Sequence, residues 1–199
     1  MICPKCKGEK VKVTVSGTTP QILSQTPIEC EVCKGSGKLP NKLNVGSGKD
    51  YREGEEWINL EPNEIFKADM RMDIREAEFE ENSLDEILAQ DVIDHVTYVE
   101  CKELMLKFYL WLKPNGVLNI HLPNFTNISK WAADGNHEAM TWVHGTDGDR
   151  AYYSTNFVKW SYTPESLKAL LEWAGFIVFQ YFDTCNGYGQ RQLATKRVE

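Results

Sequence analysis

Short apolar runs, separated by polar and glycine-containing stretches, recur along the chain from residue 42 onwards. Runs of three to seven residues that are rich in β-branched, aliphatic and aromatic side chains are typical of strands buried in a sheet. The last two runs flank a turn-forming stretch, Asn186-Gly187-Tyr188-Gly189, which favours an antiparallel hairpin at the edge of the sheet. The pattern predicts seven strands, at residues 43–45, 57–60, 66–72, 84–89, 117–122, 176–182 and 192–198.

A helical spacing replaces these runs in two places. Residues 98–112 carry apolar side chains at helical intervals, and Pro114-Asn115-Gly116 ends the predicted helix. Thr163-Pro164 begins a second helix with an N-cap and a proline at the first position, and this helix runs to Ala174. A short helix is expected near 128–133. We interpret the apolar stripe of the first helix as core packing; it consists of Cys101, Leu104, Met105, Phe108 and Leu112.

Strands that alternate with helices or loops, followed by a closing hairpin, indicate an α/β fold. We predict a Rossmann-like, seven-stranded, mostly parallel sheet whose last strand is antiparallel. The 199 residues fit one ordinary domain and a small module. The stretch from Gly35 to Pro40 has the composition of a linker, so we divide the chain into a module at 1–40 and a domain at 41–199.

Two C-x-x-C pairs mark the module, one at Cys3 and Cys6 and the other at Cys30 and Cys33. Their spacing predicts one tetrahedral zinc site with four thiolate ligands. The alternation around Val13 predicts a strand, so the module is expected to be β-rich and to need the metal to fold. A redox dithiol or an adventitious pair of motifs is the alternative.

The second pair lies in CEVCKGSG, which has the C-x-x-C-x-G-x-G pattern of the cysteine-rich region of DnaJ-type chaperones. The first pair departs from that pattern because Lys10 stands at its last position. The resemblance covers about 40 residues and implies a zinc module without implying a chaperone role.

Charge is unevenly distributed. Residues 1–50 carry a net charge of +4, so the rest of the chain carries −11. An acidic body argues against broad binding of nucleic acid, and only the module is suited to an anionic partner. Apolar runs are too short to span a bilayer, and no secretory signal is apparent at the start, so we expect a cytoplasmic protein without a membrane partner.

The candidate chemistry begins where the first two predicted strands end. Gly46-Ser47-Gly48 follows the first strand, and Glu61 ends the second. Glycines let the backbone approach a bulky ligand closely, and an acid after the next strand can accept hydrogen bonds from both hydroxyls of a ribose. The separation is too short for a dinucleotide fold, because no full helix fits between Gly48 and Trp57.

In these residues the chain resembles the class I S-adenosylmethionine-dependent methyltransferases, in particular small, type-11-like members. The resemblance covers residues 42–198. Its most family-like segments are LNVGSG, WINLE, SLDEILAQDVIDHV, WLKPNGVLNIHLPNF and TPESLKALLEWAGF.

The resemblance implies a cofactor site for S-adenosylmethionine. Glu61 would bind the ribose hydroxyls, and Asp73 and Ile74 would bind the adenine, although Asp73 could instead pair with Arg71 or Arg75. Asp91 could instead cap a helix. The implied cofactor-binding residues are Gly46, Ser47, Gly48, Glu61, Asp73, Ile74, Gln90 and Asp91. Two departures weaken the anchor for the donor's amino group, because Asn44 and Asp50 stand where the family often has an acid and a third glycine.

Methyl transfer needs a base only if the acceptor must lose a proton. We take Asp91, His95 and His144 as the catalytic candidates, with His121 as a further histidine of the same kind. His95 follows Asp91 by four residues and would share a helix face with it.

The expected function is transfer of a methyl group from S-adenosylmethionine to a small molecule, glycan, nucleotide or protein, with the zinc module aiding recognition of the acceptor. The alternative is an inactive methyltransferase fold that acts as a zinc-bearing binding or adaptor module.

Overall fold

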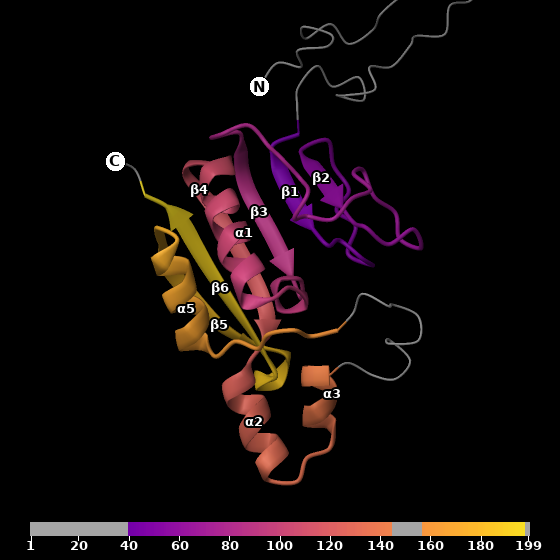
Figure 1. Cartoon of the computed structure of the whole chain (residues 1–199), viewed down its shortest axis with the longest axis vertical. Coiled ribbons are helices and arrows are strands. Elements are labelled where there is room, and N and C mark those ends of the chain that lie inside the picture. Colours follow the sequence, from indigo (N-terminus) through magenta and orange to yellow (C-terminus); the bar gives the residue numbers. More distant parts are fainter. Residues whose placement is uncertain (1–39, 145–156, 198–199) are drawn as a thin grey trace, which may run out of the picture.

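The computed structural model describes residues 40–144 and 157–197. Six strands form a single sheet in the order β2-β1-β3-β4-β6-β5 (Figure 1). The strands are β1 (Lys42–Val45), β2 (Trp57–Leu60), β3 (Leu84–Gln90), β4 (Leu112–Pro123), β5 (Phe176–Thr184) and β6 (Gly189–Lys196).

The strand directions confirm the predicted mixed sheet. β1 pairs in parallel with β2 and β3, and β3 pairs in parallel with β4. β6 is antiparallel to both of its neighbours, β4 and β5, and its arrow in Figure 1 points opposite to those of β3 and β4. The final strand is therefore the antiparallel one, as the turn at 186–189 predicts.

The strand predicted at 66–72 does not form, so the sheet of the described residues has six strands where we expected seven. What remains of that strand is one parallel bridge between Leu60 and Met70. Asp69 turns back so that its carboxylate accepts from the backbone and side chain of Asn59. Arg71 donates to backbone carbonyls of the same segment, including that of Phe66 at 2.6 Å. These side-chain bonds to the backbone close the segment into a loop.

Both longer helices form where predicted. α1 (Tyr98–Trp111) begins at a capping box between Thr97 and Glu100. α5 (Pro164–Trp173) begins at a second capping box, between Thr163 and Ser166. A capping box satisfies backbone donors that have no partner within the helix. Several predicted boundaries were wrong by one to five residues, and the larger differences concern three places. Leu112 already belongs to β4, β6 begins at Gly189, and the helix expected near 128–133 is α2 (Phe125–Ala133).

α1 and α5 pack against one face of the sheet. The pairing register aligns Leu43, Ile87, Leu118 and Ala194 in a row across four strands, and all four are fully buried. Burial of a large aliphatic side chain contributes about 1.5–3 kcal/mol. The helices complete the core with Cys101, Leu104, Met105, Phe108 and Trp111 from α1 and Leu167, Leu170 and Leu171 from α5.

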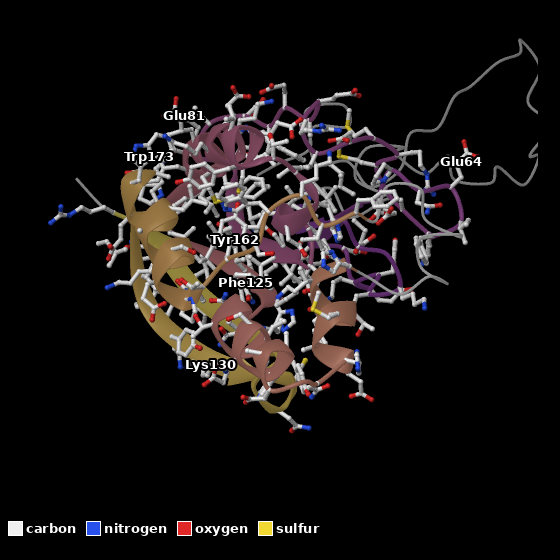
Figure 2. All side chains as sticks on the ribbon, turned by 60° about the horizontal axis from the view of Figure 1, so that its bottom comes forward. Glu64, Glu81, Phe125, Lys130, Tyr162 and Trp173 are labelled. Carbon is white, nitrogen blue, oxygen red and sulfur yellow. The ribbon has the colours of Figure 1, made fainter. Side chains whose placement is uncertain are left out.

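α2 and α3 (Glu138–His144) lie at the end of the sheet toward which the parallel strands point (Figure 1). Tyr162 connects this part to the core, since it is 1% exposed and its carbonyl accepts from the backbone of Phe125. Figure 2 shows Tyr162 and Phe125 toward the centre of the molecule and Glu64 and Glu81 at its rim. The loops at this end of the sheet are therefore backed by a packed interior.

Candidate functional site

A cleft of about 680 Å³ opens at the carboxyl ends of β1, β2 and β3. This volume is in the range of sites for cofactors and other small molecules, and the position is where open α/β sheets bind their ligands. The wall is formed by the loops that follow the three strands, by residues 73–75, and by Phe157 and Lys159 from the far end of the chain.

The structure brings together nearly all of the residues that the sequence singled out. His121 and His144 are not among the cleft-lining residues; His144 ends α3 and is exposed, and His121 is buried in β4. The lining includes Gly46, Ser47, Gly48, Glu61, Asp73, Ile74, Gln90, Asp91 and His95.

The two glycines of the first loop have different surroundings. Gly46 has a φ of +58°, and a Cβ at this position would lie 2.7 Å from Cγ2 of Val92. Gly48 has a φ of +48°, but its Cβ would meet only the carbonyl oxygen of Gly46, at 3.9 Å. Gly46 is therefore packed into the wall, whereas the space beside Gly48 is open to the cleft. This is a cradle that fits a bulky ligand at the backbone.

Glu61 ties the first loop to the second. It is 6% exposed; one carboxylate oxygen accepts from the backbone N–H of Gly48 at 2.8 Å, and the other accepts from that of Asn63 at 2.9 Å. A carboxylate oxygen has two lone pairs, so each oxygen can still accept from a ligand hydroxyl. Glu61 is thus held rigidly at the edge of the cleft with capacity for two more hydrogen bonds.

A buried amide network that the sequence analysis missed supports the same loops. The side chain of Asn44 donates to the carbonyl of Asp50 at 2.8 Å and to Oδ1 of Asn59 at 3.0 Å. The Asn59 amide in turn donates to the carbonyl of Arg52 and to the carboxylate of Asp69. At position 44, where the resembling family often has an acid, the structure therefore has a side chain whose hydrogen bonds hold the loop. The sequence signal that could have predicted this network is the pair Asn44 and Asn59, which occupy equivalent positions on the neighbouring strands β1 and β2.

The carboxylate of Asp73 forms the ion pair that was the alternative to adenine binding. Nε of Arg75 donates to Oδ1 at 2.9 Å and Nη2 donates to Oδ2 at 2.7 Å, while Nη1 of the same guanidinium donates to Glu100 at 2.6 Å. The bonds from Arg75 hold the pKa of Asp73 below its usual value. Asp73 is thus an ionised acceptor at the cleft wall. The carboxylate still has lone pairs that could accept a hydrogen bond from adenine, so the predicted contact with adenine stays a prediction.

The prediction that a helix starts at Asp91 and carries His95 on the same face was wrong. Asp91 has a φ of +51°, residues Ile93–His95 form a 3-10 turn, and the N-cap of α1 is Thr97. Asp91 therefore does not cap a helix, and it does not share a helix face with His95. Both still line the cleft, because the loop carries them along its wall. A positive φ at a non-glycine residue costs energy, and aspartate adopts it more readily than most residues do.

Asp91 is held by His121, at the end of β4. Nδ1 of His121 lies 3.2 Å from Oδ1 of Asp91, and Nε2 lies 2.8 Å from the hydroxyl of Thr184. The backbone N–H of Asp91 also donates to the carbonyl of His121 at 2.9 Å. The side chain of His121 is 8% exposed, whereas that of Asp91 is 46% exposed. Thr184 was missed, because β5 and β3 are far apart in sequence.

Asp94 lies directly behind this wall and is 3% exposed. Burial, with a further contribution from Asp91, raises the pKa of its carboxyl to about 6, against an ordinary value of 3.8. One oxygen of Asp94 has no hydrogen-bond partner among the described residues. Its neighbour His95 likewise has a buried Nδ1 that lacks a partner there.

No group of three or more His, Cys, Asp or Glu side chains within 40–144 and 157–197 is arranged to hold a metal ion. The four cysteines of the predicted zinc site, Cys3, Cys6, Cys30 and Cys33, lie outside the described residues. Among the described helices none is long and apolar enough to cross a membrane.

No protein-family model matches the sequence, and no curated protein matches it. Solved structures, in contrast, resemble the fold. A complex from Haloferax volcanii between the Trm112 methyltransferase activator and a methyltransferase is 10% identical, with a TM-score of 0.56 over 80% of this chain and 83% of that one. A SAM-dependent methyltransferase from Methanosarcina mazei is 14% identical, with a TM-score of 0.56 over 80% of this chain and 93% of that one.

A third similar structure contains ligands. The 1,6-didemethyltoxoflavin-N1-methyltransferase of Burkholderia thailandensis was solved with 1,6-didemethyltoxoflavin and S-adenosylhomocysteine bound. It is 14% identical, with a TM-score of 0.55 over 80% of this chain and 72% of that one. At such identities the likeness concerns the fold, and the chain has the mixed, Rossmann-like α/β fold of SAM-dependent methyltransferases.

Proposed function

We propose that this protein is a methyltransferase that takes its methyl group from S-adenosylmethionine bound in the cleft. The observation that carries the proposal is the bond between the backbone N–H of Gly48 and the buried carboxylate of Glu61. It joins the glycine loop after β1 to the acid after β2 in one wall of the cleft. That pairing fits a ligand with a ribose and an extended backbone contact.

Each part of the donor has residues of suitable chemistry. Gly46, Ser47 and Gly48 are proposed to hold its amino-acid portion, and Glu61 its ribose hydroxyls. Asp73 and Ile74 are proposed to receive the adenine, and Gln90 and Asp91 to face the reacting end. The bound sulfonium would supply an already activated methyl group, so these residues mainly align the donor and exclude water.

The amino group of the donor has no acid at position 44 to bind. Asp50 lines the same part of the cleft and its side chain is 59% exposed, so we propose it as the substitute anchor. The side-chain amide of Asn44 is already hydrogen-bonded within the loop and replaces the acid that would bind the donor's amino group. This replacement favours a second candidate function. In that case the fold would be inactive, and the protein would act as a zinc-bearing binding or adaptor module.

For the base we propose Asp91, with His95 as a second group on the same wall. His144, the third catalytic candidate, ends α3 and has no observed place in the cleft, so no role is proposed for it. We keep the proposal of one zinc bound by Cys3, Cys6, Cys30 and Cys33 in a module at 1–40 that aids recognition of the acceptor. The acceptor is proposed to be a small molecule, glycan, nucleotide or protein.

Incubating a cell extract with methyl-labelled S-adenosylmethionine and the full chain tests the function directly. We expect a labelled product with the wild-type protein, and at least a tenfold lower rate of labelling with Glu61→Ala at a donor concentration below saturation. Identification of the labelled compound would name the acceptor. Donor binding without any labelled product, across extracts from the native host, would favour the inactive adaptor.

A further inference from the structure

The carboxylate of Asp91 is fixed by a chain of three polar groups that come from three strands. Thr184 lies at the end of β5, His121 near the end of β4, and Asp91 directly after β3. The two hydrogen-bond distances are 2.8 Å and 3.2 Å. Among the described residues no hydrogen bond reaches the second oxygen of Asp91, Oδ2. The residue lines the cleft, and its side chain is 46% exposed.

When His121 is neutral, the chemistry of the three groups fixes where the protons lie. An ionised carboxylate only accepts, so Nδ1 of His121 must carry the hydrogen that it shares with Asp91. In the neutral imidazole Nε2 is then an acceptor, and the hydroxyl of Thr184 must donate to it. The arrangement therefore selects one tautomer of His121 and orients its ring toward Asp91.

Two further features serve this contact. A Cβ at Gly189 would overlap Oγ1 of Thr184 and lie 2.9 Å from Nε2 of His121, so a side chain at 189 would separate the pair. The backbone of Asp91 is held in the left-handed region, at a φ of +51°, by its hydrogen bond to the carbonyl of His121.

We propose that Thr184 and His121 are positioning residues that aim Oδ2 of Asp91 into the cleft as a proton acceptor, and that the methyl acceptor therefore presents an O–H or N–H group there. This inference rests on the proposed methyl transfer. The acceptor atom forms its bond to the methyl carbon as the carbon–sulfur bond breaks, with that electron pair left on sulfur and the acceptor's proton passed to Oδ2. An acceptor atom that bears no proton does not need a base, so the arrangement would not assist its methylation.

The tautomer of His121 can be observed without knowing the acceptor. Long-range ¹H–¹⁵N correlation spectra of the full chain at pH 8 should show His121 with its hydrogen on Nδ1. Thr184→Ser keeps the hydroxyl and should keep this tautomer. Thr184→Val keeps the shape and removes the donor, so the hydrogen should stay on Nδ1 beside Asp91 while the ¹⁵N shift of Nε2 changes, because this atom loses its hydrogen bond. A wild-type His121 in the Nε2–H form would overturn the proposal.

Transfer rates test the role of the pair. With methyl-labelled donor and the extract fraction that takes up label, Thr184→Val should lower kcat by about tenfold or more, since a positioned base contributes about 10²–10⁴-fold. Thr184→Ser should restore most of the rate, and the affinity for S-adenosylhomocysteine should be unchanged in both variants. A wild-type kcat in Thr184→Val would overturn the proposal. So would transfer to an acceptor atom that bears no proton.

A calorimetric titration of the wild-type chain with S-adenosylhomocysteine separates this inference from the function on which it rests. Absence of binding would refute the proposed donor site whatever the tautomer. Binding together with the Nε2–H tautomer would refute the positioning role alone. Gly189→Ala provides a second variant, and it should change the ¹⁵N shift of Nε2 in the same way as Thr184→Val, because its Cβ would separate His121 from Thr184.

Discussion

Gly46 and Gly48 form a matched pair of sites for substitution, because they have the same backbone conformation but differ in the atoms that surround them. Both have positive φ, so an alanine at either position meets a similar backbone penalty, about 1–2 kcal/mol. At position 46 the new Cβ would also lie 2.7 Å from Cγ2 of Val92, whose branched side chain has little rotamer freedom. Such overpacking costs about a further 1–3 kcal/mol.

We therefore expect Gly46→Ala to lower the free energy of unfolding by about 2–5 kcal/mol, and Gly48→Ala by only about 1–2 kcal/mol. Donor binding should show the opposite preference in the folded proteins. The Cβ that Gly48→Ala introduces would stand in the open space of the cleft. This variant should therefore weaken donor affinity by about tenfold or more, or about 1.4 kcal/mol.

Equilibrium urea denaturation measures the first effect, and calorimetric titration of the folded variants measures the second. Equal loss of stability in both variants would refute the packing of Gly46 against Val92. Unchanged donor affinity in Gly48→Ala would refute the placement of the donor beside this loop.

The remaining predictions concern a buried acid and the module. The folded-state pKa of Asp94 is raised to about 6, so the fold favours the protonated carboxyl. The contribution of this group to the free energy of unfolding is therefore present below about pH 4 and is lost as the pH rises toward 6. Denaturation at several pH values should thus show Asp94→Asn gaining stability relative to wild type across this window, and a constant difference would contradict the assignment. Elemental analysis should find one zinc per chain, and Cys33→Ser should lose it; a metal-free chain with a folded module would refute the zinc site. A chain truncated to begin at Asn41 should fold and bind the donor with unchanged affinity but methylate its acceptor poorly, and loss of donor binding in the folded truncation would contradict the domain division.

The elements with a strong local pattern were predictable. The stripe of α1 and the Thr163-Pro164 start of α5 are local features, and both helices form within a residue or two of the prediction. The strand at 66–72 was not predictable, because its alternation is real but Asp69 bonds back to Asn59 instead of facing solvent. Side-chain bonds to the backbone override a weak strand pattern in so polar a segment.

For the cleft, the glycines and Glu61 were found because each follows a strand, and parallel strands end at one edge of a sheet. The contact of His121 with Asp91 and Thr184 depends on strand order, since β6 lies between β4 and β5. The spacing of residues in the sequence does not predict the order of the strands in the sheet. A histidine at the end of a strand was the only local signal, and it gave no partner.

Calorimetric titration of the full chain with S-adenosylmethionine, in parallel with Glu61→Ala, tests the central claim most directly. Glu61 is expected to accept from both ribose hydroxyls, and each hydrogen bond to a charged acceptor contributes at most about 1.5–3 kcal/mol. We predict saturable binding at one site per chain and an affinity at least tenfold lower in the folded variant. Absence of binding to the wild-type chain, or equal affinity in the two proteins, would contradict the account.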